Sequence, residues 1–155
     1  MSLDVDLKMP GPGTPQQQGS GIFIREHGAM REMTDEEWVS RYPDREPVRY
    51  IATIDDEAEG HVVWGGNITH NLNRMAMEAG IYDVVWRPDE HNITVAGQLI
   101  EPLLAGLAIL EDDPERFKAF NPGNGWGTYD GLVDFVRDYL YACIRYRHAT
   151  VDVSR

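Results

Sequence analysis

The stretch HVVWGGNITHNLNRMAMEAG, residues 61–80, decides the fold class because two different apolar periods follow each other in it. Residues 61–64 are rich in the valine and tryptophan side chains that favour a β-strand. From Asn67 onward the apolar residues recur at helical spacing and form one stripe along a predicted helix. They are Ile68, Leu72, Met75, Ala76 and Ala79. Gly80 predicts the end of this helix, so a strand passes into a helix across the pair Gly65-Gly66.

Further strands are expected where apolar and polar side chains alternate. Residues 48–54 alternate and predict a half-buried strand, which forms a hairpin with residues 61–64 across the acidic turn at 55–60. Residues 149–154 alternate in the same way and predict a C-terminal strand that docks onto this hairpin. The apolar cluster at 22–24 predicts one more short strand.

Helix signals follow in the second half of the chain. Pro102 lies inside an apolar stretch at about 94–110, so that helix must kink or restart there. Asp113-Pro114 predicts the start of a short helix, and Thr128 caps the last one. The buried face of this last helix is predicted to hold Leu132, Val136, Tyr139, Leu140 and Cys143. The pattern predicts an α+β fold, in which about four helices pack on one side of a small, mostly antiparallel sheet.

The domain organisation follows from length and composition. A chain of 155 residues has the size of one domain. Residues 1–20 carry the Pro, Gly and Gln bias of segments that build no core, and they predict a flexible tail. Residues 21–155 are then expected to form a single globular α+β domain.

The charge balance and the cysteine count exclude several classes of function. Acidic residues outnumber basic residues by 26 to 14, for a formal net charge of -12, so nucleic acid is not an expected partner. The single cysteine, Cys143, excludes an internal disulfide, and no apolar run reaches the roughly 20 residues of a membrane span. The first residues lack the basic and apolar blocks of a signal peptide, so we expect a cytoplasmic protein.

The Gly65-Gly66 junction is the first candidate site. The free amides of a helix N-terminus suit an anion or a polar ligand group, and glycine allows a close approach. Side chains beyond the junction can add hydrogen bonds, and these are Asn67, Thr69, His70 and Asn71. The alternative is structural, with Asn67 as the N-cap of the helix and the other side chains in solvent.

The second candidate site is the loop at 121–130, where glycines surround Trp126. Either Trp126 fills the core while the glycines permit the path of the loop, or it is an aromatic platform with Asn124 and Tyr129 as polar partners. Arg87 is a third candidate. It suits a carboxylate or phosphate ligand, or alternatively an ion pair within an ordinary acidic turn.

Metal binding and covalent catalysis have little support. Residues 55–60 resemble the opening of a calcium loop, but Gly66 stands at the twelfth position, where a bidentate Glu is required. The five histidines lack the spacing of a zinc site, no Gly-x-Ser-x-Gly motif is present, and Cys143 belongs to an apolar helix face. We therefore expect no metal, no cofactor and no nucleophilic catalytic residue.

A resemblance rests on motifs in the second half of the chain. The most specific run is Asn124-Gly125-Trp126-Gly127-Thr128-Tyr129, and further motifs are found at 67–72, 86–88 and 113–117. Through them, residues 67–155 resemble a family of small, functionally uncharacterised proteins of actinobacteria and their bacteriophages. The resemblance implies no activity and no catalytic residues. It implies a site of action in the cytoplasm of a bacterial host.

Three functions remain, each with its own expectation. The first is a non-enzymatic protein that binds a small polar or nucleotide-like ligand between the two glycine-rich segments. The second is an acidic protein that contacts a basic protein surface, for instance as an inhibitor in phage–host conflict, and the third is an enzyme with His70 as general base. A homo-oligomer is compatible with each of them. The first predicts a hollow shared by His70, Asn124 and Trp126, whereas the second predicts a flat acidic face.

Overall fold

The sheet is antiparallel in the computed structural model, which describes residues 1–10, 20–49 and 60–155. The strands of these described residues are β1 (Ser2–Met9), β2 (Ile22–Glu26), β3 (Ala29–Met33), β4 (His61–Thr69) and β5 (Thr150–Ser154). Their order across the sheet is β2-β3-β4-β1-β5. The expected α+β class, with a C-terminal strand in an antiparallel sheet, is confirmed.

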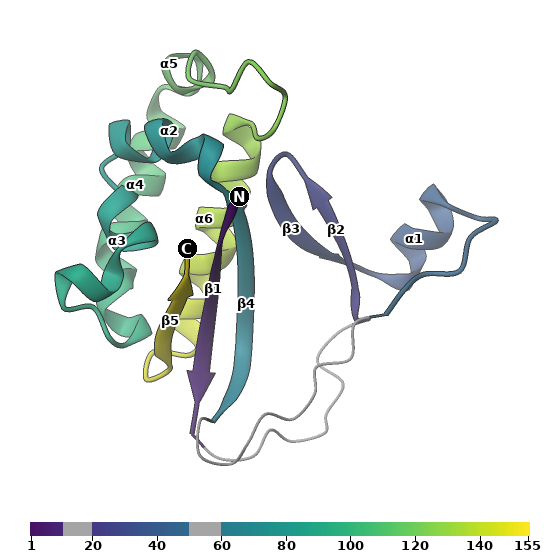
Figure 1. The fold of residues 1–155 in the computed structure, drawn as a ribbon, viewed down its shortest axis with the longest axis horizontal. Coiled ribbons are helices and arrows are strands. Elements are labelled where there is room, and N and C mark those ends of the chain that lie inside the picture. Colours follow the sequence, from purple (N-terminus) through teal and green to yellow (C-terminus); the bar gives the residue numbers. More distant parts are fainter. Residues whose placement is uncertain (11–19, 50–59) are drawn as a thin grey trace.

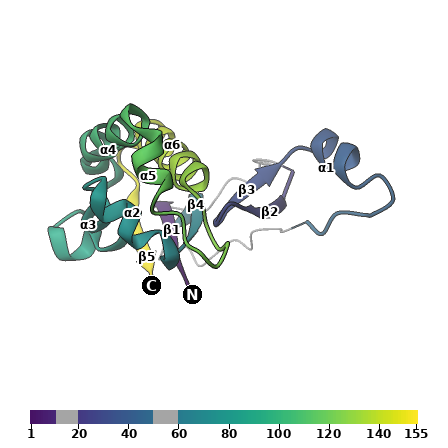
Figure 2. The same ribbon diagram turned by 90° about the horizontal axis from the view of Figure 1, so that it is seen from above.

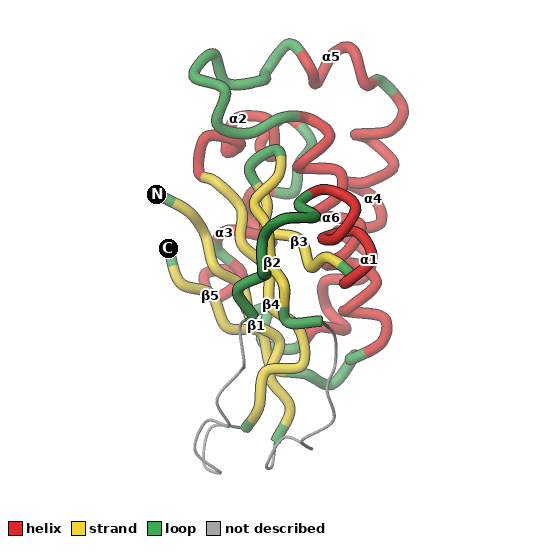
Figure 3. Tube along the Cα trace, turned by 90° about the vertical axis from the view of Figure 1, so that its right-hand side faces the viewer, coloured by secondary structure: helices red, strands yellow, loops and turns green. Residues whose placement is uncertain are grey.

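Helices cover one face of this sheet, but α1 is not among them. The helices of the described residues are α1 (Asp35–Arg41), α2 (Asn73–Glu78), α3 (Tyr82–Trp86), α4 (Ile100–Asp112), α5 (Pro114–Lys118) and α6 (Tyr129–Arg145), with the short 3₁₀ turns η1 (His70–Leu72), η2 (Pro88–His91) and η3 (Ala96–Leu99). The long helices α4 and α6 lie behind β1, β4 and β5, whose other face is in view in Figure 1. Figure 3 shows the same two layers from the side, with these strands next to the helices.

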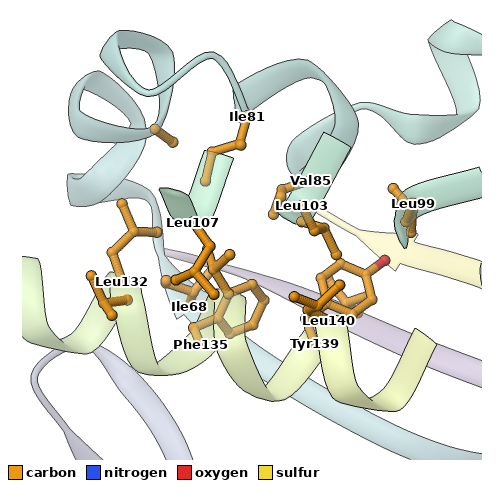
Figure 4. Packing of buried hydrophobic residues seen from close by; sticks show 14 of the residues in the cluster. Ile68, Ile81, Val85, Leu99, Leu103, Leu107, Leu132, Phe135, Tyr139 and Leu140 are labelled. Atoms are coloured by element: carbon orange, nitrogen blue, oxygen red, sulfur yellow. The ribbon is translucent and has the colours of Figure 1, made fainter. Parts of the chain in front are cut away.

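The main core lies between the sheet and the two long helices. Three residues of β1 are completely buried, and these are Leu3, Val5 and Leu7. Figure 4 shows Leu107 of α4 and Phe135 of α6 packed around Ile68 of β4. Removal of this much apolar surface from water is the main source of stability for the fold.

The prediction of a flexible tail over residues 1–20 is wrong for its first half. Residues 2–9 form β1, which lies between β4 and β5 and pairs with both. These residues form a strand because their apolar side chains recur at every second position. Leu3, Val5 and Leu7 face the core, and the residues between them face away. The Pro and Gly bias begins only at residue 10, and residues 11–19 lie outside the described part of the chain. The N-terminus is therefore part of the sheet.

The expected hairpin of residues 48–54 with 61–64 falls mainly on residues 50–59, which lie outside the described part of the chain. Its described end behaves differently from the expectation, since Arg49 forms an isolated bridge with Ile22 of β2. The expected docking of the C-terminal strand on this hairpin is also wrong. β5 pairs with β1, because β1 occupies the place next to β4.

The strand before the first helix is longer than expected. Gly65 and Gly66 lie within β4 and not at a turn, and the strand continues to Thr69. An added Cβ on Gly66 would lie 2.9 Å from the ring of Phe135, so this glycine lets α6 approach the sheet. Gly80 ends the helical segment as expected, with a φ of 74°.

The later helices begin where the sequence predicts. Pro102 lies in the first turn of α4, where its missing amide costs no intrahelical hydrogen bond. Asp113 caps α5 through a hydrogen bond from the Arg116 amide, and Thr128 caps α6 through one from the Gly131 amide. The predicted buried face of α6 is confirmed, since all five of its residues are at most 3% exposed.

Residues 20–49 form an arm that projects from the rest of the molecule, with α1 at its far end (Figures 1 and 2). Among the described residues, β3 pairs with β4 only through Ala29 and Ile68. The arm is attached near its tip, the turn His27-Gly28, whose φ angles of 52° and 88° are the positive values that a two-residue hairpin turn favours. This attachment determines the surroundings of the candidate site.

Candidate functional site

The two glycine-rich segments are in direct contact. An added Cβ on Gly127 would lie 2.9 Å from the methyl group of Thr69. The tip of the arm completes this contact, because the Thr69 amide donates to the Gly28 carbonyl at 2.9 Å and the Thr128 amide donates to the His27 carbonyl at 3.0 Å. The expected proximity of the two segments is therefore present. The arm tip packs against both of them.

The N-terminus of α6 has little capacity left for an anion. The Gly131 amide donates to Oγ1 of Thr128 at 3.1 Å, and the Tyr129 amide donates to Oδ1 of Asn121 at 2.7 Å. The Thr128 amide is already bonded to the arm tip at His27. These amides at the start of the helix are satisfied inside the chain, so the dipole end of α6 is capped by protein groups.

Asn67 is a strand residue and not the expected N-cap. Its side chain is 7% exposed and links three elements. Its Oδ1 accepts a hydrogen bond from the Arg25 guanidinium of the arm, and its Nδ2 donates to Ser2 and Asp4 of β1. The capping role passes to Thr69, whose Oγ1 accepts a bond from the Asn71 amide at 3.3 Å. Asn67 thus fastens the arm to the sheet.

His70 is held by a tryptophan. Its Nδ1 accepts a hydrogen bond from Nε1 of Trp86 at 2.9 Å. Burial of the imidazole lowers the pKa of His70, with a smaller contribution from the nearby N-terminal ammonium group, against a hydrogen bond to the Ser2 backbone that raises it. The ring is neutral near pH 7 and its Nδ1 lone pair is occupied, so a role as general base through that atom is not supported.

Arg87 and Tyr129 are also engaged within the chain. Arg87 donates to Glu90 at 2.6 Å and to the hydroxyl of Tyr82 at 3.3 Å. This agrees with the alternative in which Arg87 forms an ion pair within an acidic turn. The hydroxyl of Tyr129 donates to the Leu110 carbonyl at 2.7 Å, and burial raises the pKa of this hydroxyl. Both side chains are therefore held by groups of the chain itself.

Trp126 is exposed, so of the two alternatives the one in which it fills the core is wrong. Its side chain is 62% exposed. The backbone beneath it is nevertheless ordered by hydrogen bonds, since the Trp126 amide donates to Oδ1 of Asn124 at 2.9 Å and the Gly125 amide donates to the Pro122 carbonyl at 3.2 Å. Gly125 and Gly127 have φ angles of 76° and 117°, which direct the chain around the indole. The platform alternative agrees with this geometry.

Two surface hollows are formed by described residues elsewhere. One lies on the arm and is lined by Ser20, Glu32, Met33, Thr34, Asp35 and Glu36. The other lies between α2, α4 and α5 and is lined by Glu78, Ala108, Ile109, Asp112, Asp113 and Arg116. Neither of them includes His70, Asn124 or Trp126, so neither is the hollow that a small ligand would require at this site.

Comparison with known proteins gives no homologue from which a function can be transferred. No family model, curated protein or solved structure matches the chain. Within the described ranges, no group of three or more His, Cys, Asp or Glu side chains is arranged to hold a metal ion. No helix in those ranges is long and apolar enough to cross a membrane.

The sequence reasoning missed the arm tip as a component of this site. Arg25, His27 and Gly28 were not among the candidate residues, yet they contact Asn67, Thr128 and Thr69. One signal was available. A His-Gly pair between two short apolar runs is compatible with a two-residue hairpin turn, which would have placed a strand on each side of it.

Proposed function

We propose that this protein is a non-enzymatic interaction protein that binds another protein through the Trp126 loop, residues 121–127. The observation that carries the proposal is the 62% exposure of Trp126 on a backbone fixed by hydrogen bonds. Tryptophan is among the residues most enriched at the energetic centres of protein interfaces. A loop that is already ordered loses little conformational entropy on binding, so more of its contact energy remains as affinity.

The charges around the loop favour a basic partner. Residues 119–129 contain no charged side chain, and the charges that flank them are mixed, with Lys118 directly before the segment and Asp130 directly after it. Four exposed carboxylates, those of Asp112, Asp113, Glu115 and Asp130, outnumber the two exposed cations, Arg116 and Lys118. An apolar centre with a charged rim is the usual composition of such interfaces. The partner in this proposal has an apolar pocket for the indole and Lys or Arg around it.

A small polar ligand is less well supported. Among the candidate residues, the polar groups of Asn67, Thr69, His70 and Tyr129 are all used in hydrogen bonds within the chain. Among the candidate residues, the ones with exposed side chains are Asn71, Asn124 and Trp126. In keeping with the resemblance noted above, the proposed partner is a protein of the bacterial cytoplasm.

The test compares the wild type with Trp126→Ala and Tyr141→Ala. Tyr141 is a matched control, since it is also 62% exposed but lies on α6. Each tagged variant is used to capture proteins from the native host, and the complexes are weighed by native mass spectrometry. We expect one protein to be retained at fixed stoichiometry by the wild type and by Tyr141→Ala, to be lost with Trp126→Ala, and to elute as salt is raised.

Two outcomes would contradict the proposal. One is equal retention of the same protein by all three forms, because the loop then makes no essential contact. The other is a retained small molecule, lost in Trp126→Ala, with no protein bound. Because Trp126 is exposed, its replacement should change the free energy of unfolding by no more than about 0.5 kcal/mol, which a urea titration checks. A loss of binding can then be assigned to the interface.

A further inference from the structure

The Trp126 loop contains an Asn-Gly pair. Asn124 precedes Gly125, and none of the other five asparagines of the chain precedes a glycine. The backbone nitrogen that follows an asparagine can attack the side-chain amide carbon, and a Cβ on the following residue hinders this attack. Glycine has no Cβ, so an Asn-Gly pair offers the least hindrance to the reaction.

The side chain of Asn124 is folded toward its own backbone. Its Oδ1 accepts a hydrogen bond from the Trp126 amide at 2.9 Å, which closes an Asx turn. The ring closed by this bond contains both Cγ of Asn124 and the backbone nitrogen of Gly125. The turn therefore holds the two atoms that would react near each other, and such proximity lowers the entropy cost of a reaction.

The Trp126 amide also lies where the attack creates charge. Addition of the Gly125 nitrogen to Cγ of Asn124 places negative charge on Oδ1, to which this amide already donates. A donor fixed at the position of a developing oxyanion accelerates additions of this kind. One hydrogen bond opposes the reaction, because the Gly125 amide, which must lose its proton, donates to the Pro122 carbonyl. At 3.2 Å this bond is at the long end of the usual range.

The Asn-Gly pair is open to water, unlike the other acidic or amide side chain that precedes a glycine in this region. Asn124 and Gly125 are both exposed, and an added Cβ on Gly125 would have no atom within 4 Å. Asp130 also precedes a glycine. The Gly131 amide is however buried in the first turn of α6, where it donates to Oγ1 of Thr128. Only the Asn-Gly pair in this region is therefore both exposed and folded for the attack.

We propose that Asn124 is a site of spontaneous deamidation, with water as the co-reactant. The Gly125 nitrogen loses its proton and forms a bond to Cγ of Asn124, and the bond from Cγ to Nδ2 breaks. Ammonia leaves, and a five-membered succinimide ring remains. Water then adds to either carbonyl carbon of the ring, and the bond from that carbon to the ring nitrogen breaks. One water is consumed for each ammonia released, and the product is aspartate or isoaspartate.

Either product changes the Trp126 loop permanently. Aspartate keeps an acceptor for the Trp126 amide but adds a negative charge to residues 119–129, which contain no charged side chain. Isoaspartate routes the backbone through the former side chain and lengthens it by one methylene group, so the Asx turn beneath Trp126 is lost. The reaction requires no partner, so it proceeds whether or not the loop binds another protein.

Water enriched in heavy oxygen labels the reaction as it occurs. The folded protein is incubated in this water and then digested with trypsin in ordinary water, so that only changes during the incubation carry the label. Cleavage after Lys118 and Arg137 yields residues 119–137 as one peptide, whose fragment masses separate Asn121, Asn124 and Asp130. We expect the label at Asn124, in both aspartate and isoaspartate.

Asn92 and the variant Asn124→Gln are the controls. Asn92 is exposed and has a positive φ of 59°, but the β-branched Ile93 follows it, so we expect labelling at least about ten times slower than at Asn124. Glutamine would have to close a larger ring, so Asn124→Gln should take up no label at position 124. Equal labelling of Asn124 and Asn92 in the folded protein would overturn the proposal. Labelling of Asn124 only in urea would also overturn it, because the ordered loop would then prevent the attack.

Discussion

The carbonyl oxygen of His27 accepts a hydrogen bond from the backbone amide of Thr128 at 3.0 Å. This bond joins the tip of the arm to the cap of α6. The approach is so close that position 131 must be glycine, because an added Cβ there would lie 1.9 Å from the same His27 oxygen. The arm tip thus acts as an additional cap for α6, and the base of the Trp126 loop is fixed by it.

The first prediction concerns this contact. Gly131→Ala should lower the free energy of unfolding by about 1–3 kcal/mol, since the new methyl group must displace the backbone at His27. Gly123→Ala is the control, because no atom lies within 4 Å of an added Cβ at that position. Urea denaturation measures both. Equal stability of the two variants would show that the arm tip is not held against α6 in solution.

The second prediction concerns the N-terminal strand. Leu3→Ala should cost about 2–5 kcal/mol of stability, because Leu3 is completely buried between the sheet and the helices. Lys8→Ala on the same strand should cost no more than about 1 kcal/mol, since its ion pair with Asp152 is at the surface. Deletion of residues 1–10 should prevent folding, as judged by circular dichroism. A folded deletion variant would contradict the central place of β1.

The third prediction compares two buried tyrosine hydroxyls. In the described part of the chain the Tyr139 hydroxyl is buried without a hydrogen-bond partner, whereas the Tyr129 hydroxyl donates to the Leu110 carbonyl in the last turn of α4. Tyr139→Phe should therefore leave stability unchanged or raise it, and Tyr129→Phe should lower it by about 0.5–1.5 kcal/mol. Thermal or urea unfolding of both variants checks the difference. A destabilised Tyr139→Phe would indicate a buried water bound to that hydroxyl.

The fourth prediction is a pH dependence caused by His70. Its pKa is lowered in the folded state, so the unfolded chain binds more protons and stability falls as the pH drops below the ordinary His value of about 6.5. The loss is complete once the pH is below the lowered pKa. Urea titrations at about pH 7.5 and about pH 5.5 should show this decrease in the wild type and in His91→Gln, and a smaller one in His70→Gln. An equal decrease in all three would assign the effect to other groups.

Much of the helical part of the fold could be predicted because its signals are local. Asp113-Pro114, the Thr128 cap and the apolar stripe of α6 each need only a few neighbouring residues to be recognised. β1 was missed although its alternation is visible. An eight-residue alternation beside a Pro-rich segment is a weak signal, and its pairing partners β4 and β5 lie far away in the sequence.

The candidate site could be predicted only in part. The hypothesis of a ligand between the two glycine-rich segments requires them to be near each other, as Thr69 and Gly127 are. It did not predict that the tip of the arm packs against both segments. Glycine permits a sharp path of the chain and does not indicate on which side a neighbouring indole lies, so Trp126 was compatible with both core and surface. Asn67 also has the side chain of a helix cap, so its type does not indicate whether it lies in a strand or at the start of a helix. It lies in a strand because β4 continues to Thr69.

The pairing of β1 with β5 has a consequence for how the chain folds. Residues 4–8 lie against residues 150–154, so the sheet joins segments from opposite ends of the sequence. Contacts between such distant segments close long loops and slow the folding of a domain. On the ribosome, the first strand emerges early and has no permanent partner until β4 appears, and its second edge stays open until β5 is made. During that interval an unpaired apolar strand is exposed, which is the condition under which nascent chains aggregate or require chaperones.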